Sequence, residues 1–119
     1  MDDQLNQLVG EVRKCRICEA HLPLGPRPVL DIALSNRIAI ISQAPGTVVH
    51  GNGIPWKDKS GDRLRSWMNV DEDFFYNSGI FAIIPMGFCY PGKGKGGDLP
   101  PRKECAPQWH TPILRMLPN

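Results

Sequence analysis

The sequence predicts an α/β domain with parallel strands, on the basis of two apolar runs and the helical segment between them. The runs, residues 38–41 and 80–84, are short, continuous and rich in β-branched residues, which is typical of buried parallel strands. Helical periodicity begins near residue 60, between the two runs. Because a strand, a helix and a second strand form a right-handed crossover unit, we expect both strands to lie parallel in one sheet.

An amphipathic helix is predicted at the N-terminus, ending at about Lys14. Asp2 or Asp3 can cap it, because a side-chain oxygen at that position accepts hydrogen bonds from free N–H groups of the first turn. The apolar side chains follow the i, i+3, i+4, i+7 spacing of one helical face and are Leu5, Leu8, Val9 and Val12.

The segment between the strands is predicted to begin a helix at Ser60, which can act as its N-cap. Asp62 would then lie in the first turn, where the positive end of the helix dipole favours a carboxylate. The apolar residues on one face of this helix are Leu64, Trp67 and Met68. Gln-Ala-Pro-Gly ends the first strand, and Pro85 closes the second.

The helical signal is weak after Cys105, because Pro107 and Pro112 lack the backbone donor that a helix interior needs. Thr111 followed by Pro112 is typical of a helix start. A new helix is therefore predicted there, continuing through Leu117.

The composition is that of one small globular domain. The 119 residues are 41% apolar and 22% charged, with a net charge of +2. No run approaches the ~18 apolar residues of a membrane helix, and the acidic N-terminus differs from a signal peptide, so we expect a cytoplasmic protein. The oligomeric state stays open. Since two strands fall short of the about five or six of a usual sheet, residues 1–119 are interpreted as a single domain that lacks its C-terminal part.

Basic residues gather in one Gly/Pro-rich stretch, which contains Lys93, Lys95, Arg102 and Lys103. A net charge of +2 is too small to indicate nucleic-acid binding, so on charge alone this stretch is interpreted as a solvated loop. Its Lys-Gly repeats lack the order of a P-loop, and no Ser or Thr follows a Lys there to bind magnesium. No nucleotide cofactor is therefore expected.

The four cysteines are spaced as metal ligands. Cys15 and Cys18 form a C-x2-C pair, and Cys89 and Cys105 follow far downstream with fifteen residues between them. In a cytosolic protein this pattern favours metal over disulfides, and we favour a shared site over four unrelated buried thiols. Four thiolates can hold either zinc or a 4Fe-4S cluster, so ligand identity leaves both metals open.

Three short motifs lie after or between the predicted strands. Residues 42–46, Ser-Gln-Ala-Pro-Gly, follow the first strand, residues 53–56 are Gly-Ile-Pro-Trp, and residues 89–92, Cys-Tyr-Pro-Gly, follow the second strand. Together they resemble motifs of the uracil-DNA glycosylase superfamily. The similarity is closest to its iron-sulfur branch, whose members carry a G-E-A-P-G loop, a G-x-P-F segment and the same cysteine spacing.

The resemblance implies a three-layer α/β/α fold with a central parallel sheet and substrate at the carboxyl ends of the strands. It also implies a 4Fe-4S cluster on the four cysteines, with zinc as the alternative, and DNA as the partner. The reaction would be hydrolysis of the bond between a flipped-out base and its deoxyribose.

Several residues take roles from the family positions that they match. Trp56 replaces a stacking Phe, and an indole face can stack on any base. Gln43 replaces a Glu that orients water or stabilises the sugar cation, although an amide cannot act as a base. The rest of this base-binding loop comprises Ala44, Pro45 and Gly46. The residues matching a basic, Pro-rich loop that would contact phosphates are Lys93, Lys95 and Arg102.

Asp58 is the candidate general base. Residues 58–62, Asp-Lys-Ser-Gly-Asp, resemble a G-D-x-S-G segment of another branch, whose Asp activates water. The alternative is an ordinary exposed residue ahead of the Ser60 cap. Two family features are not matched. Pro85 stands where the iron-sulfur branch has the Asn that reads uracil, and no late His motif follows, because His110 is too early.

Three functional hypotheses follow from the sequence. The first is a base-excision glycosylase that acts on a deaminated or damaged base. The second is a non-catalytic homologue that binds DNA or recognises lesions. The third, less favoured, is a protein-binding module whose four cysteines hold a structural zinc ion. Strand breaks in uracil-containing DNA after alkali separate the first from the second, and salt-dependent DNA binding separates the second from the third.

Overall fold

The computed structural model describes residues 2–117. The elements in chain order are α1 Asp2–Arg13, the 3-10 helix η1 Glu19–His21, β1 Ile38–Ile40, α2 Thr47–Asn52, α3 Lys59–Met68, α4 Glu72–Asn77, β2 Phe81–Ile83, β3 Lys93–Gly94, β4 Gly97–Asp98 and α5 Cys105–Met116. No helix within this range is long and apolar enough to cross a membrane. α1 confirms the predicted N-terminal helix, with Asp3 inside its first turn; the side chain of Asp2, the other predicted cap, lies outside the described residues.

The two predicted strands pair in parallel, as the crossover pattern indicated. β1 and β2 lie in register from Ile38 opposite Phe81 to Ile40 opposite Ile83. β2 is buried throughout, because the segment around Asp31 bridges to Ile83 on its other edge. β1 has no such second neighbour within the described chain, and Ile38 is half exposed.

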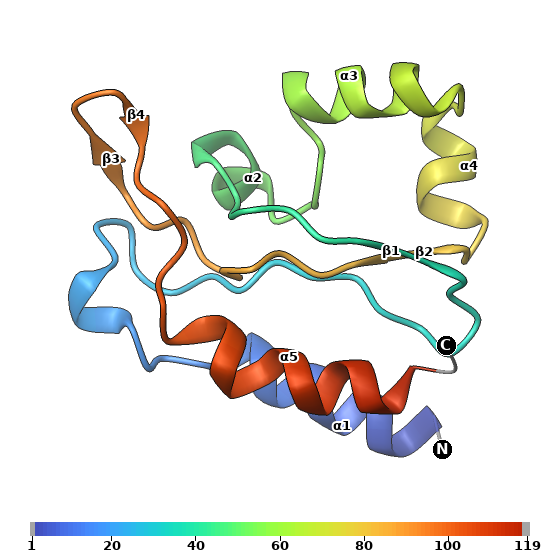
Figure 1. The fold of residues 1–119 in the computed structure, drawn as a ribbon, viewed down its shortest axis with the longest axis horizontal. Helices are drawn as coiled ribbons and strands as arrows, with labels where there is room; N and C mark the ends of the chain where they lie inside the picture. Colours follow the sequence, from blue (N-terminus) through green and yellow to red (C-terminus); the bar gives the residue numbers. More distant parts are fainter. Residues whose placement is uncertain (1, 118–119) are drawn as a thin grey trace.

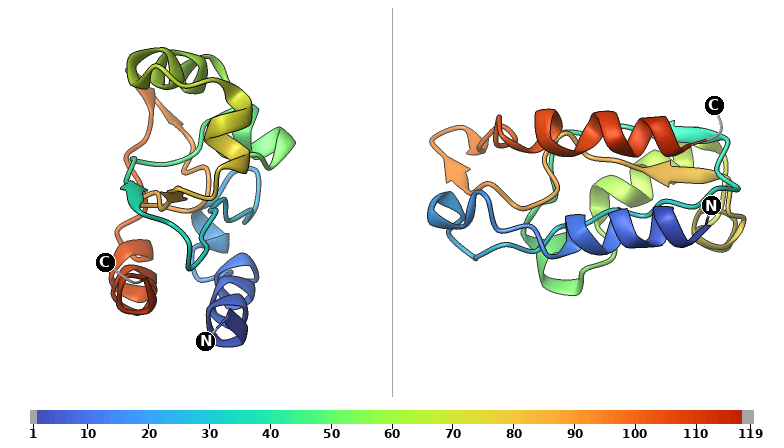
Figure 2. Two further views of the ribbon diagram at one scale, coloured as in Figure 1. Left: turned by 90° about the vertical axis from the view of Figure 1, so that its right-hand side faces the viewer. Right: turned by 90° about the horizontal axis from the view of Figure 1, so that it is seen from below.

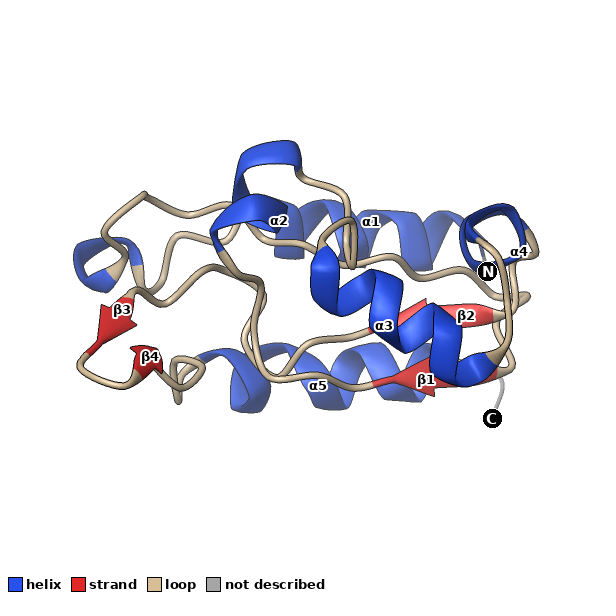
Figure 3. Ribbon diagram, turned by 90° about the horizontal axis from the view of Figure 1, so that it is seen from above, coloured by secondary structure: helices blue, strands red, loops and turns tan. Residues whose placement is uncertain are grey.

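Helices lie on both sides of these strands. α1 and α5 run side by side below them in Figure 1, and they remain adjacent in both views of Figure 2. α2, α3 and α4 lie on the opposite side, and Figure 3 shows α3 passing in front of the strands. The chain therefore has an α/β fold whose small parallel sheet is covered by helices on two sides.

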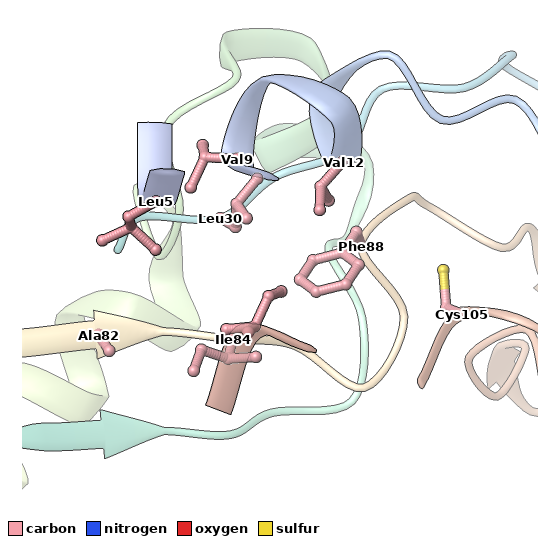
Figure 4. Close-up of a cluster of buried hydrophobic side chains, with 9 residues drawn as sticks. Leu5, Val9, Val12, Leu30, Ala82, Ile84, Phe88 and Cys105 are labelled. Atoms are coloured by element: carbon pink, nitrogen blue, oxygen red, sulfur yellow. The ribbon is translucent and has the colours of Figure 1, made fainter. Parts of the chain in front are cut away.

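The main core fills the space between α1, α5 and the strands. Figure 4 shows Val9 and Val12 of α1 on the side of the helix that faces Leu30 and Phe88. The buried members of this core are Leu5, Val9, Val12, Leu30, Ala82, Ile84, Phe88, Cys105 and Ile113. Because burying one such large side chain contributes about 1.5–3 kcal/mol, this cluster holds α1 and α5 against the sheet.

The start and the buried face of α3 differ from the prediction. Asp58, not Ser60, is the N-cap, since its Oδ1 accepts the N–H of Gly61 at 2.8 Å. Leu64 and Met68 pack against the Phe75–Phe81 core as expected. Trp67 does not, because it is 77% exposed, and the buried residue next to this face is Arg65.

The C-terminal helix also differs from the prediction. α5 runs without interruption from Cys105 to Met116, with Pro112 inside it, so no new helix starts at Thr111. Pro112 removes one helical hydrogen bond, which ordinarily kinks or ends a helix. The helix continues because Cys105 and Ile113, on both sides of the proline, are buried against the core that α5 shares with α1.

Two glycines give a matched test of this packing. A methyl group on Gly61 would lie 1.6 Å from the carbonyl oxygen of Trp56, whereas one on Gly10 in α1 would meet nothing within 4 Å. We expect Gly61→Ala to lower the free energy of unfolding by about 3 kcal/mol or more, because backbone must move. Gly10→Ala should raise it by about 0.5–1 kcal/mol. Urea unfolding measures both, and equal midpoints for the two variants would contradict the close contact.

Candidate functional site

A pocket of about 260 Å³ opens where the chain leaves β1 and β2. The loops after the two strands stay joined, since Met86 N–H donates to the carbonyl oxygen of Ser42 and Gly87 N–H donates to that of Gln43, at 2.7 and 2.8 Å. The pocket-lining residues are Val29, Ser42, Gln43, Ala44, Pro45, Gly46, Val49, Pro55, Trp56, Asp58, Ser60, Ile83, Pro85 and Asp98. All six residues predicted to bind or act on a base therefore line this one pocket.

Trp56 lies in the wall of the pocket with an unusual backbone. Its φ is 62°, in the left-handed region that a bulky residue rarely adopts. The side chain is half-buried and packs against the core around Phe75 and Phe81. Trp56 therefore borders both the pocket and the core.

Asp58 combines a structural role with a place in the pocket. One carboxylate oxygen caps α3 through Gly61, which fixes the orientation of the group. The hydrogen bonds of the described residues engage only that oxygen, so the second one remains available in the pocket. A carboxylate held in this way can accept a proton from a water molecule without losing its position.

Asp98 is a pocket residue that the sequence did not single out. The stretch predicted to be a solvated loop folds into a small hairpin, β3 and β4, which places the Asp98 carboxylate 3.7 Å from where a side chain on Gly46 would begin. Tyr90 O–H donates to Asp98 Oδ1 at 3.5 Å. Burial, followed by this neighbouring carboxylate, raises the pKa of Tyr90. The sequence around Asp98 gave no indication of a pocket residue, because only the folded hairpin brings Asp98 to the pocket.

All four cysteines line a second, small cavity. Cys15 follows α1, Cys18 precedes η1, Cys89 follows β2 and Cys105 begins α5, and all four are free thiols. Burial raises the pKa of the Cys89 thiol to about 12 and also raises the pKa values of Cys18 and Cys105. Between residues 2 and 117, however, no three His, Cys, Asp or Glu side chains are close enough to hold a single metal ion.

Nitrogen donors surround this cavity. Trp109 Nε1–H donates to Cys15 Sγ at 3.3 Å. Arg102 lines the cavity, and its Nε is buried without a hydrogen-bond partner among the described residues, while its Nη2 donates to Glu104 at 2.9 Å. Four thiols and an unsatisfied cationic donor form a set that fits a sulfur-rich group of negative charge.

The comparison with known families decides the family of this chain. Residues 31–119 match the Uracil DNA glycosylase superfamily, a span of well over half the chain. The chain belongs to this superfamily. Membership supports an α/β fold and a uracil-DNA glycosylase-like function in general. The matched span contains every residue that lines the pocket except Val29, and two of the four cysteines.

Two residues, Pro85 and His110, meet at the end of β2. Pro85 lines the pocket without a side-chain donor, and its carbonyl oxygen accepts a hydrogen bond from His110 Nε2 at 2.7 Å. The His110 ring also lies 5.7 Å from the ring of Phe88, and it is not among the pocket-lining residues. His110 therefore contacts the end of β2 outside the residues that line this pocket.

The predicted phosphate-contacting residues fall into two groups. Lys93 and Lys95 lie exposed on the β3–β4 hairpin, the same hairpin that carries Asp98 into the pocket. Arg102 instead pairs with Glu104 beside the cysteines. The lysines are thus free to meet a polyanion near the pocket, whereas the Arg102 guanidinium is directed to the second cavity.

Proposed function

We propose that this protein removes a deaminated base, such as uracil, from DNA by hydrolysing the bond between the base and its deoxyribose. The observation that carries the proposal is the pocket at the ends of the two parallel strands, where the Gln43 loop, Trp56 and Asp58 meet. In open α/β folds, ligands bind at this edge of the sheet. We also infer that the sheet is the centre of a three-layer α/β/α domain.

The pocket suits a flipped-out base. Extruding a base from duplex DNA costs a few kcal/mol of stacking and pairing, so the site must offset this cost by stacking the base on one of its own side chains. The Trp56 indole offers an aromatic face in the pocket wall, and the Gln43 amide can hydrogen-bond to the base or to water. A volume of about 260 Å³ leaves room for one small planar group and little else.

Asp58 is assigned as the general base. A water oxygen forms a bond to the sugar carbon, the bond from that carbon to the base nitrogen breaks, and the water proton passes to Asp58. The electron pair of the broken bond leaves with the base. Capping of α3 keeps the Asp58 carboxylate in a fixed direction, which lowers the entropy cost of positioning it for this step.

Asp58→Asn separates the chemical role from the structural one. Asn caps a helix about as well as Asp, so the melting temperature should stay unchanged. Uracil excision should fall by roughly 100-fold or more, because general base catalysis typically contributes 10²–10⁴-fold. The measurement is alkali-induced cleavage of uracil- and hypoxanthine-containing oligonucleotides after incubation with the anaerobically purified protein. Equal cleavage by the variant and the wild type would remove Asp58 from the mechanism.

We further propose that Cys15, Cys18, Cys89 and Cys105 hold a 4Fe-4S cluster. Support comes from the four thiols around one cavity and from the buried Arg102 Nε beside them, a cationic donor that suits a sulfur-rich cluster of negative charge. When bound, such a cluster supplies a structural cross-link between the ends of α1, β2 and α5. That cross-link steadies the segment leading to the β3–β4 hairpin.

A non-catalytic DNA-binding homologue is the second candidate. It is favoured by Gln43 and Pro85, since neither side chain can act as a base. Lys93 and Lys95 would contact phosphates in either case, so DNA binding should weaken with salt. Tight, uracil-dependent binding without any alkali-labile sites would support this candidate over the glycosylase.

A further inference from the structure

The most buried cation in the chain lies directly behind the pocket wall. Arg65 in α3 is only 4% exposed, although it carries a charge that is costly to remove from water. It donates from Nη1 to the carbonyl oxygen of Trp56 at 3.0 Å and to Tyr76 Oη at 3.3 Å, and from Nη2 to Asp62 at 2.8 Å. Its guanidinium carbon also lies 5.3 Å from the Phe75 ring centroid, within cation–π range.

Tyr76 completes this network from α4. Its hydroxyl donates to the carbonyl oxygen of Pro55 at 2.6 Å while accepting from Arg65, so its single proton is accounted for. Two successive carbonyl groups, those of Pro55 and Trp56, are therefore held by a partly buried Tyr76 and a buried Arg65 from two different helices. Because these hydrogen bonds are largely removed from water, they hold the Pro55–Trp56 backbone in place.

The backbone held in this way is the strained one. The left-handed φ of Trp56 costs of order 1–2 kcal/mol for a residue with a side chain, and it persists only where the surroundings impose it. The N-terminus of α3 contributes to this constraint, since Gly61 lies against the Trp56 carbonyl group so closely that a methyl group there would clash.

We propose that Arg65 and Tyr76 form a clamp that sets the direction of the Trp56 ring in the pocket and so act as positioning residues for base recognition. The part concerning recognition rests on the proposed glycosylase function. Without the clamp, Trp56 returns to an ordinary negative φ and its ring leaves the orientation in which it lines the pocket. The clamp itself is a property of the folded protein and can be tested without DNA.

Fluorine NMR of the full chain labelled with fluorotryptophan provides that test. The protein has three tryptophans, and the Trp56 resonance is identified by its loss in Trp56→Phe. Tyr76→Phe removes only the hydroxyl, and Arg65→Lys keeps the charge but loses the two-pronged donor. Both variants should shift or broaden the Trp56 resonance while leaving the resonance of Trp109 in place. Arg63→Lys is the matched control, because Arg63 lies exposed on the same helix and its side chain makes no hydrogen bond among the described residues.

The excision assay then separates positioning from stability. Tyr76→Phe should lower the single-turnover excision rate about tenfold with little change in DNA affinity, and Arg63→Lys should leave both unchanged. An unmoved Trp56 resonance in Tyr76→Phe overturns the clamp, whether or not the protein excises uracil. A moved resonance in a protein with no glycosylase activity keeps the clamp and rejects the proposed function. If Arg65→Lys fails to fold, Tyr76→Phe alone decides, since its ring packing against Phe75 is retained.

Discussion

Trp56→Ala is expected to lower uracil excision by about 100-fold, because stacking of a base on an aromatic ring is worth roughly 1–3 kcal/mol. The variant removes the aromatic face of the pocket, so an extruded base regains none of its lost stacking. Single-turnover cleavage of a uracil-containing oligonucleotide measures the effect. Trp56→Phe should retain most of the activity, since a smaller ring can still stack.

Trp67→Ala is the control for this prediction. Trp67 is also a tryptophan, yet it is 77% exposed on α3 and does not line the pocket. Its loss should leave excision unchanged. Because Trp56 also packs against the core, Trp56→Ala should lose some stability as well, and thermal melts must show that it is folded at the assay temperature. Full activity of folded Trp56→Ala would show that the pocket does not receive a base.

Cys89→Ser is expected to have the largest effect on stability. Loss of one ligand should abolish cluster binding, together with bound iron, bound sulfide and the visible absorption of the protein. Metal binding at such a site is coupled to folding, and several kcal/mol of lost stabilisation corresponds to a drop in melting temperature of roughly 10–20 °C or more for a small domain. Metal analysis, absorption spectra and thermal melts after anaerobic purification measure these quantities.

The other cysteine variants distinguish a shared site from separate buried thiols. If one cluster binds all four, Cys15→Ser should lose iron as completely as Cys89→Ser, although Cys15 is the least buried of the four. If the thiols are unrelated, Cys15→Ser should be nearly neutral and only the buried positions should destabilise the fold. Bound zinc without colour would replace the cluster with the alternative metal.

The elements with a clear periodic pattern were predictable. α1 and β2 follow from residues whose local preference and burial agree, so the pattern and the structure coincide there. β1 pairs in parallel as predicted, but the expectation that it is buried was wrong, because no further strand covers its outer edge within the described residues. The strands are shorter than the apolar runs, because only three residues of each run pair with one another. That the motif residues line one pocket was predictable, since both loops leave parallel strands at one edge, whereas their roles stay predictions.

The start of α3 was ambiguous in the sequence. Asp58 and Ser60 are both good N-caps, and nothing local separates them. The choice depends on Gly61, whose lack of a side chain lets the helix begin against the Trp56 carbonyl group. Gly61 and the Trp56 carbonyl group meet only in the folded chain, so the sequence pattern does not predict their contact.

Arg65 and Asp98 were missed for the same physical reason. An arginine in a helix is ordinarily solvated, and Arg65 is buried only because oxygen atoms from the Pro55–Trp56 turn and from Tyr76 converge on it. Asp98 enters the pocket through a hairpin whose strands have two residues each, which is too short for any periodic signal. In both cases the partners lie on different elements, and their meeting is decided by packing.

Quantification of the free base released from a uracil-containing oligonucleotide tests the central claim most directly. The iron-loaded protein should release one uracil for each abasic site formed, and Asp58→Asn should release at least roughly 100-fold less in the same time. Absence of free uracil from a folded, iron-loaded protein that still binds the oligonucleotide would contradict base excision and leave a DNA-binding member of the superfamily.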